Sequence, residues 1–217
     1  MCGRFNLTAS EDELKTHFRL TQLSGLESSY NIPPGQQILS IIQPDGEACQ
    51  AVWLYWGLVP FWSKNPKISH SLFNARAESV AEKPSFRTAF RQRRCLIPAT
   101  GFYEWQTTDS GKQAYHICRR DHGLFAFAGL WDCNDASGQA LYTCTVITTE
   151  ATALMAPIHQ RMPVIIPKEN YERWLDKHAS PEQLKVLLAN PAYQDMMAVP
   201  ISDRVNNPVH NDRQCLL

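Results

Sequence analysis

Closely spaced segments rich in Val, Ile, Tyr, Phe and Thr occupy the middle of the chain, and they restrict its fold more than any other feature. They cover residues 95–97 with 101–106, 114–119, 124–131 and 141–148, and Gly, Asp and Ser lie between them. β-Branched and aromatic residues favour strands, and short polar connections favour antiparallel neighbours. We therefore predict the α+β class, with a curved, mostly antiparallel sheet or open barrel and peripheral helices.

The other segments fit the same arrangement. Strands are also predicted at residues 39–43, 49–58 and 164–166, and a strand or extended loop at 72–78. Helices are predicted at residues 10–20, 84–93, 168–176 and 181–188, and Ser10 and Ser180 each begin a capping-box pattern. The 217 residues contain no evident linker or repeat. We therefore predict one domain over residues 2–217, with Met1 removed.

The charge balance excludes a strongly basic surface over the whole protein. Lys and Arg total 21, as do Asp and Glu, so the formal net charge is zero. Nucleic-acid binding would therefore depend on a local patch. Four arginines lie close together in the sequence, namely Arg87, Arg91, Arg93 and Arg94. This cluster is either such a patch or the solvated end of a helix, and the sequence leaves both readings open.

The seven cysteines are scattered, and no two have the C-x-x-C spacing. An odd number without that spacing argues against a disulfide framework and against a thiolate zinc site. The histidines include no H-x-x-x-H pair, so we expect neither a metal nor a cofactor. The first residues do not resemble a signal peptide, and no apolar run reaches transmembrane length. We therefore expect a soluble, reduced, cytoplasmic protein that does not bind membranes.

Cys2 follows the initiator methionine, and its small side chain permits an aminopeptidase to remove Met1. The new first residue would carry an α-amine beside a thiol. The pKa of such an amine is roughly 7.7–8.0, so part of it is neutral at physiological pH. A neutral amine attacks an aldehyde to give an imine, and the adjacent thiol then closes a thiazolidine ring. The alternative is that Cys2 is an inert, tolerated second residue.

Three polar residues alternate with alanine in the stretch from Asn74 to Glu78. In an extended segment, residues two apart share a face, so Asn74, Arg76 and Glu78 are predicted to project together. Such a polar triple with small spacers would line a cleft. An edge strand with one solvated face would give the same pattern.

An acid and a base lie in two further segments. Glu104 stands between Tyr103 and Trp105 in a predicted strand, whose alternation places both rings on the opposite face. Desolvation would raise the pKa of Glu104 toward the range useful for proton transfer. His159 and Arg161 lie two apart in a predicted ordered loop, and supply a proton carrier and a phosphate-binding fork. Alone, Glu104 also fits a surface position, and a single H-x-R pair is a weak signal.

Seven short motifs occur in order along the chain, and their combination resembles the SRAP (SOS response-associated peptidase) family. They are residues 1–5 (MCGRF), 30–35 (YNIPPG), 56–60 (WGLVP), 73–78 (FNARAE), 101–105 (GFYEW), 158–163 (IHQRMP) and 205–208 (VNNP). Each motif is short, but together they extend over nearly the whole chain. Pro33 is a departure, since it stands where many members have a smaller residue.

The resemblance implies a nucleophile and three assisting residues. Cys2 would form a covalent link through its amine and its thiol, and Asn74 would hold both the N-terminal residue and an opened deoxyribose. Glu104 would transfer protons during imine formation and ring closure. His159 would protonate the sugar ring oxygen and would assist reversal of the link.

The resemblance also implies contacts with DNA. Three arginines would grip backbone phosphates, namely Arg4, Arg76 and Arg161. Two tryptophans would pack near bases or shape the cleft, namely Trp62 and Trp105. Pro34 would lie in a loop that wedges against the duplex beside the lesion.

The implied function is a thiazolidine cross-link between Cys2 and the ring-opened abasic deoxyribose of single-stranded DNA, including single-strand/double-strand junctions. A monomer would form it at the bacterial nucleoid and so protect the site during the DNA damage response. Two other functions fit the same residues. An autoproteolytic peptidase with an N-terminal nucleophile would use Cys2 on peptides, and a non-covalent single-stranded DNA-binding module would bind reversibly.

Overall fold

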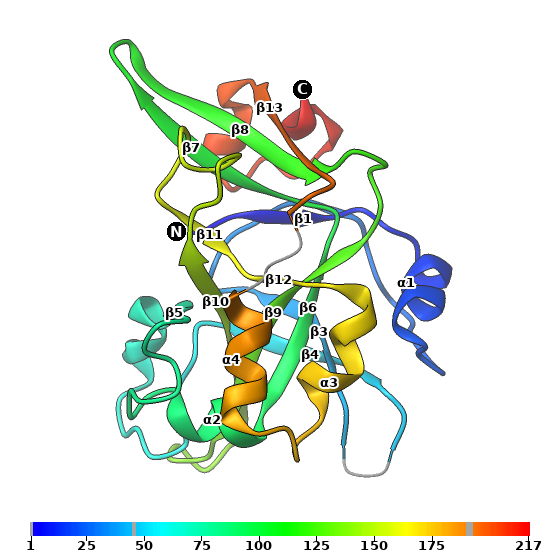
Figure 1. Ribbon diagram of the computed structural model, residues 1–217, viewed down its shortest axis with the longest axis vertical. Helices are drawn as coiled ribbons and strands as arrows, with labels where there is room; N and C mark the ends of the chain where they lie inside the picture. The colour runs from blue at the N-terminus through cyan, green and yellow to red at the C-terminus, as the bar shows by residue number, and fades with distance from the viewer. Residues whose placement is uncertain (1, 45–46, 190–192) are drawn as a thin grey trace.

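A closed barrel of five strands forms the lower part of the molecule in Figure 1. The structure is a computed structural model that describes residues 2–44, 47–189 and 193–217. Around the ring the strands are β10 (Leu141–Glu150), β4 (Gln50–Trp56), β3 (Gln37–Ile42), β6 (Arg94–Ala99) and β9 (Phe125–Asn134). The ring closes because β9 and β10 also pair with each other, over six residue pairs from Leu141↔Asn134 to Val146↔Gly129.

A second sheet of five antiparallel strands lies above the barrel in this view. Its order is β13 (Met196–Ile201), β8 (Gly111–Arg119), β7 (Gly101–Thr108), β1 (Phe5–Leu7) and β2 (Ser29–Ile32). Only Thr100 separates β6 of the barrel from β7 of this sheet. The sheet therefore continues directly from the barrel wall, and β1 brings the first residues of the chain against β7.

Three short strands extend the barrel at its rim, namely β5 (Asn74–Arg76), β11 (Arg161–Pro163) and β12 (Ile165–Ile166). Both β5 and β11 pair with β10, while β12 pairs with β9. The pairings of β10 with β4 and β5 are parallel, whereas the other ladders of the described residues are antiparallel. The predicted α+β class with a curved, mostly antiparallel sheet is confirmed, and the curvature continues to full closure.

Helices lie outside the two sheets. The α-helices of the described residues are α1 (Glu11–Phe18), α2 (Arg87–Gln92), α3 (Tyr171–Leu175) and α4 (Pro181–Ala189). The 3₁₀ helices are η1 (Pro66–Ser71), η2 (Lys168–Asn170), η3 (Asp203–Asn206) and η4 (Arg213–Leu216). The capping box predicted at Ser10 is present, because Ser10 Oγ accepts from the Glu13 amide and Glu13 Oε2 accepts from the Ser10 amide. The helix predicted at residues 168–176 is η2 followed by α3.

The arginine cluster of residues 87–94 does not form one basic patch. Arg94 is only 4 % exposed, and its guanidinium donates to the main-chain carbonyls of Phe90, Trp174 and Asp176 at the ends of α2 and α3. Arg93 pairs with buried Asp132 at 3.1 Å. Helix ends leave carbonyls without intrahelical partners, and Arg94 satisfies them. Two of the four arginines therefore serve the fold.

Aromatic rings fill the junction between the barrel and the second sheet. Phe5 packs edge-on against Trp56 of the barrel at 5.3 Å and against Phe127 at 5.8 Å, measured between ring centroids. Phe102 of β7 packs against Phe127 at 5.9 Å. Edge-to-face pairs of this kind stabilise a core by about 0.5–1.5 kcal/mol each beyond the burial of their area. This packing fixes β1 and β7 against the barrel.

Gly101 stands where two polar side chains approach the main chain of β7. His116 Nε2 lies 3.0 Å from Asn6 Oδ1, and Asn6 Nδ2 donates to Thr100 Oγ1 at 2.8 Å. Because Asn6 uses its amide group on Thr100, its oxygen accepts from the Nε2–H of His116. A Cβ at Gly101 would lie only 2.0 Å from His116 Nε2. The glycine is required by this close approach.

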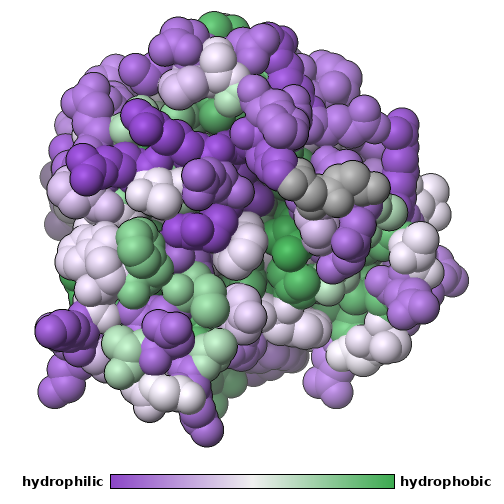
Figure 2. Space-filling view, turned by 90° about the horizontal axis from the view of Figure 1, so that it is seen from below, coloured by the Kyte–Doolittle hydropathy of each residue, from purple (hydrophilic) through white to green (hydrophobic). Residues whose placement is uncertain are grey.

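The surface carries mostly polar residues, with small patches of apolar residues between them (Figure 2). Seen from below, polar side chains dominate the upper part of Figure 2, and apolar side chains gather in patches in its middle and lower parts. Large exposed aromatic residues include Trp53, Phe61, Trp62 and Tyr142, each about half exposed. Among the described residues, no helix is long and apolar enough to cross a membrane.

Candidate reactive site around Cys2

Cys2 lies buried where the segment leading into β1 meets the barrel rim. Its side chain has no exposed surface, and its main-chain carbonyl accepts a 2.8 Å hydrogen bond from Asn74 Nδ2. Asn74 begins β5, which is held beside β10 through the pair Val146↔Asn74. Asn74 Oδ1 is buried and meets no hydrogen-bond donor among the described residues. The rim strand therefore fixes the main chain of Cys2 through the side-chain amide of Asn74.

Glu104 of β7 lies close enough to the Cys2 thiol for its charge to act on that group. The strand turns Tyr103 and Trp105 to the opposite face, where they pack with the C-terminal segment, as predicted from the alternation. Glu104 is 3 % exposed, and its burial raises the pKa of the carboxyl, while nearby His159 lowers it in part. Burial also raises the pKa of the Cys2 thiol, and the negative charge of Glu104 adds to that rise. Both groups therefore hold protons more firmly than they would in water.

His159 lies in the turn before β11, and the main chain of Arg161 holds its ring. His159 Nδ1 lies 2.9 Å from the amide nitrogen of Arg161 and 3.0 Å from its carbonyl oxygen. A neutral ring accepts at Nδ1 from the amide, and an imidazolium donates from Nδ1 to the carbonyl. The main chain of Arg161 therefore fixes the orientation of the His159 ring.

Arg4 is tied into the protein by its Nη1 atom. This atom donates to Asn31 Oδ1 at 2.8 Å and to the carbonyl of Val205 at 2.7 Å, and the guanidinium lies 5.8 Å from the Trp105 ring centroid. Asn206 accepts from Trp105 Nε1 at 2.6 Å. The C-terminal segment therefore holds both Arg4, through Val205, and Trp105, through Asn206.

The family model described as SOS response associated peptidase (SRAP) matches residues 1–208 of this sequence. The chain belongs to the SRAP family. The abasic site processing protein YoqW of Bacillus subtilis is 43 % identical over 222 residues, which cover 100 % of this chain and 99 % of that protein. The abasic site processing protein HMCES of Xenopus tropicalis is 30 % identical over 261 residues, which cover 100 % of this chain and 78 % of that protein.

Solved structures agree with this assignment. A crystal structure of a Bacteroides thetaiotaomicron protein superposes with a TM-score of 0.88 at 27 % identity, and covers 99 % of this chain and 98 % of its own. A phage-related protein of Bordetella bronchiseptica superposes with a TM-score of 0.75 at 27 % identity, over 92 % of this chain. The barrel and the second sheet are thus the SRAP fold.

The residues predicted for the SRAP site fall into two groups. Cys2, Asn74, Glu104 and His159 come together through the contacts described above. Other predicted residues lie at or near the surface: Arg76 is exposed, Trp62 is 50 % exposed, and Pro34 lies in the turn after β2. Asn74 and Arg76 share β5, but Glu78 lies in the following turn rather than on the strand. Met1, which we predict to be removed, lies outside the described residues.

Tyr193 belongs to this site, although no motif indicated it. Its hydroxyl donates to the carbonyl of Pro163 at 2.9 Å, and its ring packs against Phe102 with centroids 6.5 Å apart. Phe102 and Glu104 lie two apart on β7, so Tyr193 covers the face that carries Glu104. Burial raises the pKa of the Tyr193 hydroxyl, and negative charge at Cys2 and Glu104 contributes to the rise. Tyr193 stands alone and far from every motif in the sequence, so no sequence pattern pointed to it.

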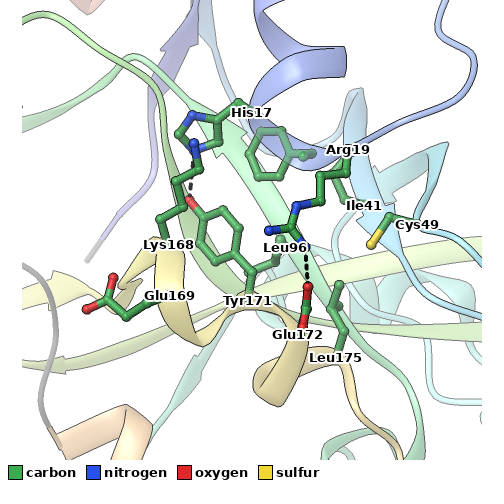
Figure 3. A pocket seen from close by; sticks show the side chains of 11 residues that line it. His17, Arg19, Ile41, Cys49, Leu96, Lys168, Glu169, Tyr171, Glu172 and Leu175 are labelled. Atoms are coloured by element: carbon green, nitrogen blue, oxygen red, sulfur yellow. Dashed lines mark hydrogen bonds and ion pairs between the residues drawn. The ribbon is translucent and has the colours of Figure 1, made fainter.

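The cavity in Figure 3 is separate from the SRAP site. It has a volume of about 190 Å³ and lies between α1, α3 and the barrel strands β3 and β6. His17 Nε2 lies 3.3 Å from Tyr171 Oη, and Arg19 forms an ion pair with Glu172 at its edge. None of the predicted site residues lines it. The candidate chemistry therefore resides around Cys2 and not in this cavity.

Proposed function

We propose that the protein processes abasic sites by linking Cys2 covalently to the ring-opened deoxyribose of single-stranded DNA. The observation that carries the proposal is the meeting at Cys2 of a main-chain anchor, Asn74, and a buried carboxyl, Glu104. The names of the relatives, abasic site processing proteins, support the same class of substrate. Removal of Met1 is required, because only a free α-amine beside the thiol can close the ring.

The proposed reaction balances as a condensation. The neutral amine of Cys2 adds to the C1′ aldehyde, and the resulting carbinolamine loses its hydroxyl as water to give an imine. The thiol then adds to the imine carbon, forming the C–S bond of a thiazolidine. The amine loses two protons to the water and regains one from the thiol, so no oxidant or reductant is needed. Ring closure is intramolecular, which favours capture over strand cleavage by β-elimination.

Glu104 and His159 would move the protons. A carboxyl whose pKa is raised by burial is suited to donate a proton to the leaving hydroxyl and to accept the thiol proton afterwards. His159, whose ring is held at Nδ1 by the main chain of Arg161, would protonate the sugar ring oxygen and favour the open aldehyde. Burial raises the pKa of Glu104, and the nearness of His159 lowers it in part, so the two groups are close enough to act on each other.

DNA contacts would come from residues around the site. Arg76 is exposed beside Asn74 and suits a phosphate. Arg4 and Arg161 would add cationic atoms, and Trp105 and Trp62 would offer rings for base stacking. Pro34 lies in a turn that would wedge against a duplex at a junction. A formal net charge of zero favours weak binding to undamaged DNA, so the covalent step would supply the specificity.

A gel that compares two substrates tests this proposal. The protein is incubated with an abasic single-stranded oligonucleotide and, separately, with peptides. A heat-stable DNA adduct that Cys2→Ser abolishes supports cross-linking, and some strand incision by that variant is expected from its remaining amine. Peptide cleavage without an adduct would support the peptidase alternative, and salt-sensitive binding without an adduct would support a non-covalent DNA-binding module.

A further inference from the structure

Glu78 forms a two-pronged ion pair with Arg161 beside the reactive site. Arg161 Nη1 donates to Glu78 Oε1 at 2.6 Å, and Arg161 Nη2 donates to Glu78 Oε2 at 3.0 Å. The Arg161 side chain is 17 % exposed and that of Glu78 is 47 % exposed. A bidentate pair with this geometry is directional as well as attractive, so it fixes one side chain relative to the other.

The main chain of Thr148 contacts both Arg161 and Ala77, the residue before Glu78. Its carbonyl accepts from Arg161 Nη2 at 2.7 Å and from the Ala77 amide at 2.8 Å. Thr148 lies on β10, where it pairs with Arg76 of β5 on one side and with Pro163 of β11 on the other. Strand β10 therefore carries both rim strands, and the Glu78–Arg161 pair links the segments attached to them.

Each linked segment carries a predicted reactive residue. Asn74 begins β5 and holds the Cys2 carbonyl at 2.8 Å. His159 precedes β11, and its ring nitrogen contacts the main chain of Arg161 at 2.9 Å and 3.0 Å. A shift of Arg161 therefore moves the groups that hold the His159 ring, and a shift of Glu78 moves the turn that follows Asn74.

We propose that Glu78 is a positioning residue of this site, acting through Arg161 to hold His159 in place relative to Asn74 and Cys2. This inference rests on the proposed function. Glu78 contacts neither the nucleophile nor the reacting sugar in this account. It would fix the distance between His159, in the turn before β11, and Asn74, which begins β5 and anchors Cys2.

The donors of Arg161 fit this role. Its terminal fork is occupied by Glu78, and the second proton of Nη2 goes to Thr148. Arg161 Nε is buried and meets no hydrogen-bond acceptor among the described residues. No two-nitrogen fork of Arg161 is therefore open to a phosphate while Glu78 remains in place. The Glu78–Arg161 pair therefore positions the segment that carries His159. Arg161 could bind a phosphate through two nitrogens only if Glu78 moved away.

The test compares DNA with charged and uncharged backbones. The rate of cross-linking is measured for the wild type and Glu78→Gln with an abasic single-stranded oligonucleotide, and with the same oligonucleotide carrying methylphosphonates around the lesion. Misplacement of a reacting group by about 1 Å can slow a reaction about 100-fold, so we expect Glu78→Gln to be slower by up to that factor on both substrates. Glu172→Gln, which breaks the remote Arg19–Glu172 pair, is the matched control and should react like the wild type.

Rescue separates positioning from simple loss of folding. The exchanged pair Glu78→Arg with Arg161→Glu restores opposite charges at the same places, and should recover part of the rate on the uncharged substrate. Equal rates for Glu78→Gln and the wild type would overturn the proposal, as would a defect that disappears with methylphosphonates, since the pair would then act on phosphates. If the wild type itself forms no adduct, the proposed function fails, and that outcome is distinct from a defect confined to Glu78→Gln.

Discussion

Asn74 donates its side-chain amide to the carbonyl of Cys2 across 2.8 Å, although the two residues lie 72 positions apart in the chain. This bond joins a rim strand of the barrel to the start of the second sheet. It fixes the main chain of the proposed nucleophile without touching its sulfur. The reactive site is therefore a product of the junction between the two sheets.

Loss of this anchor should slow the chemistry more than it affects folding. In Asn74→Asp the shape is kept, but the donor is replaced by a negatively charged acceptor facing a carbonyl. A misplaced nucleophile costs up to about 100-fold in rate, so we expect a large loss of cross-linking with a midpoint of thermal unfolding close to that of the wild type. A cross-linking rate equal to that of the wild type would show that Asn74 does not position Cys2.

Replacement of Glu104 by Gln should separate activity from stability. General acid–base catalysis contributes roughly 10²–10⁴-fold, so we expect a loss of rate within that range. Because burial raises the pKa of Glu104, the folded state holds its proton more tightly than the unfolded state, and stability falls as pH rises above the ordinary carboxyl pKa. Glu104→Gln should therefore be more stable than the wild type at neutral pH and lose that advantage in acid, as measured by urea unfolding.

His116 should make the fold sensitive to acid. Burial lowers the pKa of His116 from 6.5 to about 4. Between these values the unfolded chain takes up a proton that the folded chain does not, so stability falls as pH decreases through this window. In His116→Gln, which keeps a donor toward Asn6, the fall in the free energy of unfolding should be smaller by up to about 1.4 kcal/mol per pH unit. An unchanged pH dependence would contradict a neutral, buried His116.

Gly101→Ala should disrupt the passage from barrel to sheet. The new Cβ would meet His116 Nε2 at 2.0 Å and Asn6 Oδ1 at 2.7 Å, and neither side chain can retreat without losing its hydrogen bond. Overpacking of this severity costs about 3 kcal/mol or more. The control is Gly25→Ala, where nothing lies within 4 Å and only the positive φ of 77° opposes a side chain, at a cost of about 1 kcal/mol. Equal unfolding midpoints for the two variants would count against the described contacts.

Sequence patterns predicted those elements that are determined by interactions between residues close together in the chain. The capping box at Ser10 and the alternation around Glu104 both appear as expected, because hydrogen bonds and side-chain faces within one element determine them. The three-residue strand β1 gave no such pattern. It forms because Phe5 pairs with Phe102 and with Ile32, which are far away in the chain.

The contacts within the site were beyond the reach of sequence patterns for the same reason. Nothing near Glu78 indicates that its partner is Arg161, and Tyr193 reaches the site only through packing against Phe102. The sequence also left the role of the arginine cluster open, and the structure shows that Arg93 and Arg94 turn inward to an aspartate and to helix-end carbonyls. Long-range pairing decided each of these cases.

The intact mass of the protein after mixing with an abasic single-stranded oligonucleotide tests the central claim most directly. We predict a protein that lacks Met1 and a new species whose mass is the sum of protein and oligonucleotide minus one water, absent for Cys2→Ser. A protein that retains Met1, or one whose mass stays unchanged in the presence of the abasic DNA, would contradict the account.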